Sequence, residues 1–109
     1  MTEATDEERK QIHLLASDPE GVNLSRQAQS DLFSYGLTKA DVCDEIVTWI
    51  DAGERVKVTV LHSYKGLVGQ KAFELKPRLD GRIYYVKVMI QISSDTNELL
   101  LIISTHLNH

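Results

Sequence analysis

Tyr85 and Lys87 place a phenol and an ammonium on one side of a strand predicted over residues 83–92, because alternate side chains of a strand point the same way. His106 and Lys57 stand in two other alternating stretches and can share that sheet face. Such a face has the parts for metal-free cleavage of RNA, which needs a base for the ribose 2′-hydroxyl, an acid for the leaving 5′-oxygen and cations for the phosphorane charge. Histidine titrates near neutrality, so His106 is the best single candidate for the acid or the base.

The remaining side chains of this face could contact the substrate. Tyr85 could donate a proton or stack on a nucleobase. Lys57, Arg78 and Lys87 could hold the phosphate, and Lys76 lies on the same face. A solvated sheet face with no catalytic role has a similar composition, so a non-catalytic binding module remains the alternative function.

Metal and cofactor sites are not predicted. The single cysteine, Cys43, stands among apolar residues of a helix and is interpreted as a buried small hydrophobe. The histidines lack a close metal-ligand spacing, and the pair His106 and His109 lies at the very end of the sequence. We therefore expect neither a metal nor a cofactor.

Charge divides the chain into two unlike halves. Residues 1–54 carry 12 acidic and 4 basic side chains, a net charge of −8, whereas residues 55–109 carry 8 basic and 4 acidic side chains, a net charge of +4. This asymmetry favours contact between the second half and a polyanion such as RNA. The alternative is that the helical half carries solvated acids on its surface.

Three helices are predicted in the first half, over residues 5–16, 24 or 25–35, and 38–52. An acidic first turn favours the first helix, Gly36 ends the second, and Thr38 with Asp41 forms a capping pair for the third. Trp49 follows the apolar spacing of the third helix and is predicted to be a core residue.

Four strands are predicted in the second half, over residues 55–63, 70–78, 83–92 and 98–107. A tight turn over residues 79–82 is expected because its Asp-Gly pair supplies positive φ angles. In the last strand, Leu101 and Ile103 are predicted to face the helices, and Ser104 and His106 the open side.

The expected fold is α+β, with three helices on one face of a four-stranded antiparallel sheet. One domain is predicted over residues 1–109, with a helical half at about 5–52 and a sheet half at about 54–107. No apolar run approaches the roughly 18 residues of a membrane span, and the first residues lack the features of a signal peptide. We therefore expect a cytoplasmic protein.

Short motifs follow one another in the order Ala28…Leu32…Gly36-Leu37-Thr38…Asp41-Val42-Cys43…Ile46, Val56-Lys57-Val58, Lys76-Pro77-Arg78-Leu79, Ile83-Tyr84-Tyr85-Val86-Lys87-Val88 and Ile102-Ile103-Ser104-Thr105-His106. Over roughly residues 26–106 this order resembles the MqsR family of toxin mRNA interferases. The resemblance implies a RelE-like α+β fold, metal-free cleavage of mRNA and neutralisation by a partner antitoxin.

The resemblance also implies site residues. Lys57 matches the family's lysine on the first strand, and Tyr85 matches the tyrosine of its Tyr-x-Lys pattern. His106 stands where the family has a lysine, and Ala72, with Gln70 nearby, where it has a functional glutamine.

The residues and the resemblance together predict a metal-independent RNA endonuclease, the toxin of a toxin-antitoxin pair. Its predicted catalytic residues are Lys57, Tyr85 and His106, and its predicted phosphate-binding residues are Lys76, Arg78 and Lys87. The expected partners are RNA and a cognate antitoxin. The alternative is a protein- or RNA-binding module with the same fold and no activity.

Overall fold

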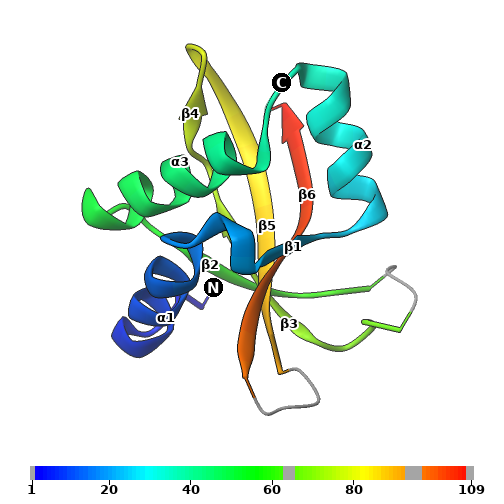
Figure 1. Cartoon of the computed structure of the whole chain (residues 1–109). Helices are drawn as coiled ribbons and strands as arrows, with labels where there is room; N and C mark the ends of the chain where they lie inside the picture. The colour runs from blue at the N-terminus through cyan, green and yellow to red at the C-terminus, as the bar shows by residue number, and fades with distance from the viewer. Residues whose placement is uncertain (1, 63–65, 93–96, 108–109) are drawn as a thin grey trace.

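The computed structural model describes residues 2–62, 66–92 and 97–107, which form three α-helices, one 3-10 turn and six strands (Figure 1). The helices are α1 (Asp6–Ala16), α2 (Arg26–Tyr35) and α3 (Lys39–Asp51), and the 3-10 turn is η1 (Pro19–Gly21). The strands are β1 (Val22–Leu24), β2 (Lys57–Val60), β3 (Lys71–Leu75), β4 (Arg78–Leu79), β5 (Arg82–Ile92) and β6 (Glu98–Leu107). The prediction of an α+β fold is confirmed.

Local hydrogen bonds explain why the three helices begin where the sequence predicts. The Thr5 and Thr38 hydroxyls each accept a backbone N–H three residues on, at 3.1 Å, while Glu8 and Asp41 accept the N–H of the capping threonines. These are two capping boxes, and Ser25 caps α2 in the simpler way. The helix starts thus depend on neighbouring residues alone.

The sheet has the strand order β1-β6-β5-β3-β2, with β4 paired to β5 beside this path. The four strands predicted from alternation occur, and they pair antiparallel in chain order. The predicted sheet of only four antiparallel strands is nevertheless wrong. The sheet of the described residues is six-stranded and mixed, because β1 adds to β6 in the parallel direction and β4 is separate from β3.

β1 has only three residues and was not predicted. Val22 lies beside Leu100 and Leu24 beside Ile102 in the parallel register. A three-residue stretch is too short for a period of two to be detected, and its pairing partner is more than seventy residues away in the sequence. β1 is therefore defined by tertiary contact.

Two local features, a proline and an Asp-Gly turn, shape the segment between β3 and β5. β3 ends before the predicted boundary because Pro77 has no backbone N–H to donate, although its carbonyl accepts the N–H of Tyr84 at 3.0 Å. β4 and β5 then form a hairpin whose turn residues Asp80 and Gly81 have φ angles of 50° and 76°. The predicted Asp-Gly turn is confirmed, with the pair of positive φ angles that a tight hairpin requires.

The main hydrophobic core lies between the helices and one face of the sheet. It contains buried residues from all three helices together with buried side chains of the strands. The strands contribute Val22, Phe73, Leu75, Leu79, Tyr84, Val86, Val88, Leu100 and Ile102. Tyr84, Val86 and Val88 of β5 therefore face the helices, on the side opposite Tyr85 and Lys87.

A second cluster covers the lower part of the opposite face and corrects the prediction for β6. Leu101 and Ile103 belong to this cluster, whereas Leu100 and Ile102 face the helices. The register shifts between Lys87 and Val88, which places one extra residue in β6 and changes the phase of the alternation. Strict alternation across this bulge therefore assigned Leu101 and Ile103 to the wrong side.

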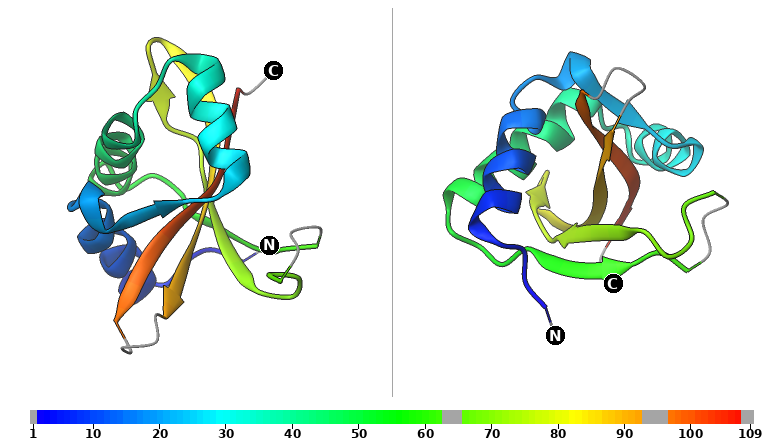
Figure 2. Two further views of the ribbon diagram at one scale, coloured as in Figure 1. Left: turned by 45° about the vertical axis from the view of Figure 1, so that its right-hand side comes forward. Right: turned by 90° about the horizontal axis from the view of Figure 1, so that it is seen from below.

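Helix α2 lies along the edge of β6 beyond the short β1, while α1 and α3 pack together on the other side of the molecule (Figures 1 and 2). Backbone groups on the open edge of β6 form hydrogen bonds with side chains of α2 and its N-cap. The Ser25 hydroxyl donates to the carbonyl of Ile103 at 2.5 Å, and Asp31 accepts the N–H of Thr105 at 2.8 Å. These contacts hold β6 in place from the side where no strand pairs.

Glu8 links α1 to β3 through a salt bridge with Lys71. Partial burial of the Glu8 carboxyl opposes ionisation, but the hydrogen bond from Lys71, the hydrogen bonds with Thr5 and the charge of Lys71 together outweigh it and lower the pKa of Glu8 below its ordinary value of 4.5. A lowered folded-state pKa adds stability that is present above the unfolded value and is lost as the pH falls through the folded value.

Glu8→Gln should therefore reduce the free energy of unfolding by about 0.2–1 kcal/mol at about pH 7, and by nothing measurable near pH 2. The amide keeps an oxygen for the capping box with Thr5, so only the charge is tested. Urea unfolding of parent and variant at the two pH values measures this, with Glu7→Gln as the exposed control. A difference that persists unchanged in acid would contradict the assignment.

Cys43 is fully buried in α3, and burial raises the pKa of its thiol to about 11. We expect no reaction with an aromatic disulfide reagent at about pH 8 in the native protein, because the thiolate is the reactive form and the sulfur is covered. Complete reaction should follow unfolding in guanidinium. Rapid labelling of the folded protein would show that α3 opens locally.

Trp49 departs from its predicted place in the core. It is half-buried at the margin of the main cluster, and its indole N–H donates to the carbonyl of Arg55 at 2.8 Å. The apolar stripe of α3 is buried at Val42, Cys43 and Ile46, all of which precede Trp49 in the helix. Within the described residues, none of the helices has the length and apolar character that crossing a membrane requires.

Candidate functional site

The upper part of the open sheet face carries two rows of polar side chains set by strand register. One row runs across four strands as Lys57, Glu74, Lys87 and Ser104. In the next row Tyr85 pairs with His106. Residues of both rows line a shallow pocket of about 290 Å³, namely Glu74, Tyr85, Lys87, Ser104 and His106. The structure thus brings Tyr85, Lys87 and His106 together.

Glu74 is the carboxylate at the centre of this face. Its Oε2 lies 3.9 Å from the Lys57 Nζ, and its Oε1 lies 3.7 Å from the Lys87 Nζ. The Glu74 side chain is 21% exposed, so its charge lies partly out of water and is matched by both lysines. No role was predicted for Glu74, and only the sheet register shows that it stands between the two predicted cations.

The three predicted phosphate contacts are divided: Lys87 lines the pocket, Lys76 lies beside it and Arg78 lies elsewhere. The Lys76 Nζ is 5.1 Å from the centroid of the Tyr85 ring, which keeps this cation at the margin of the site. Arg78 is not brought to the pocket. It follows Pro77 in β4, and its side chain lines a different pocket against α3.

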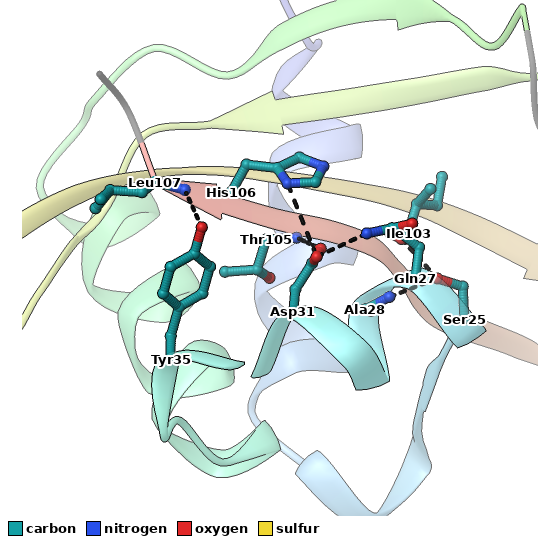
Figure 3. A network of polar contacts seen from close by, with 9 residues as sticks. All are labelled: Ser25, Gln27, Ala28, Asp31, Tyr35, Ile103, Thr105, His106 and Leu107. Atoms are coloured by element: carbon teal, nitrogen blue, oxygen red, sulfur yellow. Dashed lines mark hydrogen bonds and ion pairs between the residues drawn. The ribbon is translucent and has the colours of Figure 1, made fainter. Parts of the chain in front are cut away.

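Asp31 is a site residue that the sequence analysis missed. Its side chain is 8% exposed, Oδ2 accepts the N–H of Thr105 at 2.8 Å, and Oδ1 accepts the Gln27 amide at 2.8 Å. Figure 3 shows the same carboxylate directed at the His106 ring, with Oδ1 3.8 Å from Nδ1. A buried carboxylate that faces Nδ1 favours one orientation of the imidazole ring.

A signal for Asp31 does exist in the sequence. Asp31 stands three residues after Ala28 and four before Tyr35, and thus on the inward face of α2 beside Leu32. An acid at such a position needs a buried partner. The identity of that partner, the N–H of Thr105 with His106 next to it, depends on how α2 packs against β6.

The lower part of the same sheet face carries the apolar second cluster. Ala72, which the motif resemblance aligns with a functional glutamine, is fully buried with Met89 in the second cluster. Among the described residues no three His, Cys, Asp or Glu side chains are grouped closely enough to hold a metal ion. His109, considered with His106 as a metal pair, lies outside the described residues.

Comparison with known proteins identifies no relative: no protein-family model, curated protein or solved structure matches the chain. The geometry of the site is therefore the basis for the functional proposal.

Proposed function

We propose that this protein is a metal-independent RNA endonuclease whose active site is the pocket formed by β3, β5 and β6. The observation that carries this proposal is the convergence of Glu74, Lys87, Tyr85 and His106 in one pocket, with the buried Asp31 carboxylate behind His106. A carboxylate, an imidazole and lysines on one rigid surface are the groups that transesterification at phosphorus requires.

The register suggests how the roles divide. Glu74 and His106 stand on β3 and β6, with β5 between them, so their backbones are about 10 Å apart and leave room for a ribose and its phosphate. The Glu74 carboxylate would take the proton of the 2′-hydroxyl as its oxygen attacks phosphorus. The His106 imidazolium would give a proton to the departing 5′-oxygen, and the products would be a 2′,3′-cyclic phosphate and a 5′-hydroxyl end.

The other predicted residues support this reaction. Lys57 and Lys87 would neutralise the phosphorane oxygens, and Lys76 would hold a neighbouring phosphate. The Tyr85 hydroxyl would donate to the phosphate, or its ring would stack on a base. Asp31 would act as a positioning residue, since it faces Nδ1 and leaves Nε2 directed away from α2.

We place the protein with the MqsR-like toxins of RelE-like fold, acting in the cytoplasm and neutralised by a cognate antitoxin. Support comes from the ordered motifs and from the four antiparallel strands that follow one another beneath the helices. The charge of Glu74, matched by two lysines, is the feature that favours the alternative of a non-catalytic binding module with the same surface.

Incubation of the purified protein with single-stranded RNA in EDTA distinguishes the two functions. We expect cleavage that persists in the chelator, because every proposed catalytic group belongs to the protein. The products should carry 2′,3′-cyclic phosphate ends, because the 2′-hydroxyl is the proposed nucleophile. Binding of RNA without cleavage would favour the binding module. Cleavage abolished by EDTA would contradict the proposed mechanism.

A further inference from the structure

A second pocket, of about 380 Å³, opens between the C-terminal half of α3 and the β4–β5 hairpin. Its apolar wall is formed by Trp49, Pro77 and Ile83. The hydrogen bond from the Trp49 indole to Arg55 fixes the ring at this wall, and Ile83 is 37% exposed although its strand neighbour Tyr84 is buried. The pocket therefore presents a preformed, flat apolar surface to solvent.

Charges around this pocket are separated by sign. Glu45 and Glu54 line it from α3 and the segment that follows. Lys76, between β3 and β4, and Arg78, in β4, line it from the other side. A ligand that fits this pocket must carry an apolar ring for the apolar wall. It must also carry a hydrogen-bond donor on the side of the two glutamates and an anion on the side of the two cations. A nucleotide has all three, since its base stacks, its exocyclic amine donates and its phosphate carries the negative charge.

Lys76 connects this pocket with the proposed active site. Its side chain lines the α3 pocket, and its Nζ lies over the ring of Tyr85, which lines the pocket of Glu74 and His106. The two pockets are therefore neighbours on one surface, with a cation at their junction. A single RNA strand can pass from one to the other with its phosphate on Lys76.

We propose that the α3 pocket is a nucleobase subsite that binds a nucleotide flanking the scissile phosphate. The inference rests on the proposed function and adds a recognition site to it. The base stacks against Trp49 and Pro77, Arg78 contacts its phosphate, and the half-buried Glu45 accepts its exocyclic amine. Adenine, cytosine and guanine carry such an amine and uracil does not, so the subsite disfavours uracil.

Trp49 is the only tryptophan of the chain, so its fluorescence reports on this pocket directly. The full chain carrying His106→Ala is titrated with short oligoadenylate and oligouridylate, so that binding is measured without cleavage. We expect saturable quenching, with adenylate bound about 10-fold more tightly than uridylate. Arg78→Ala should weaken adenylate binding about 10-fold, whereas Arg82→Ala, which removes an exposed cation of the same hairpin outside the pocket, should not.

Glu45→Ala tests recognition of the amine separately from stacking, because it removes the oxygens that would accept the amine. We expect it to reduce the preference for adenylate over uridylate while quenching by both persists. Unchanged Trp49 emission at RNA concentrations that saturate cleavage by the parent protein would overturn the subsite and leave the pocket to a protein partner. Equal affinity of the Arg78→Ala and Arg82→Ala variants for adenylate would overturn it as well.

Failure of the proposed function gives a different pattern. If the parent protein does not cleave RNA, yet oligoadenylate quenches Trp49 and Arg78→Ala weakens that effect, the subsite stands and the catalytic assignment falls. If the parent protein cleaves RNA while Trp49 does not respond, the assignment of catalysis stands and the subsite falls.

Discussion

His106→Ala should slow RNA cleavage by about 10²–10⁴-fold and leave the protein folded, because it removes the proposed acid from an exposed position. The His106 side chain is 50% exposed on the open face of the sheet, so its truncation leaves no cavity in either hydrophobic cluster. Initial rates on single-stranded RNA in EDTA measure the loss, and circular dichroism checks the fold. His13→Ala, the same change on α1, should cleave at the parental rate.

Variants of neighbouring groups assign the remaining roles. Glu74→Gln should lower the rate by a similar factor if this carboxylate is the base. Tyr85→Phe keeps the ring and deletes only the hydroxyl, so a parental rate would make Tyr85 a stacking surface. Should His106→Ala, Glu74→Gln and Lys57→Ala all cleave like the parent protein, the active site lies elsewhere.

Asp31→Asn separates positioning from structure. The amide retains an oxygen for the N–H of Thr105, so the edge of β6 stays bonded, but the charge facing His106 is lost. We expect kcat to fall by about 10²-fold with KM unchanged, since the imidazole would no longer be held in one orientation. If the fraction of unfolded protein accounts for the whole loss of activity, Asp31 acts only through the fold.

Ile102→Ala should lower the free energy of unfolding by about 2–5 kcal/mol, a large share of the roughly 5–15 kcal/mol of a typical domain. Ile102 is fully buried and pairs with Leu24 of β1 on one side and Val88 of β5 on the other. Its truncation leaves a cavity where both strands and the helices meet. Urea unfolding monitored by Trp49 fluorescence measures the change.

Ile92→Ala provides the matched control. Ile92 is at the end of β5 and is 73% exposed, so the same truncation should change the free energy of unfolding by less than about 0.5 kcal/mol. Similar losses for the two variants would mean that β6 does not form the centre of the core.

Elements with local causes could be predicted from the sequence. The helix starts follow from capping residues such as Thr5 and Thr38, and the hairpin turn follows from Asp80 and Gly81. The long alternation of β5 placed Tyr85 and Lys87 on one face correctly. Each of these features depends on residues within a few positions of one another, so periodicity and turn chemistry suffice to predict it.

Tertiary structure alone decided the features that depend on contacts between distant segments. β1 is a strand only because it pairs with β6, and the bulge opposite Lys87 reverses the expected faces of Leu101 and Ile103. Arg78 leaves the predicted site because the chain turns at Pro77 and its side chain meets α3. Asp31 approaches His106 across 75 residues of sequence because α2 satisfies the open edge of β6. Such approaches depend on the packing of whole elements, which no local pattern encodes.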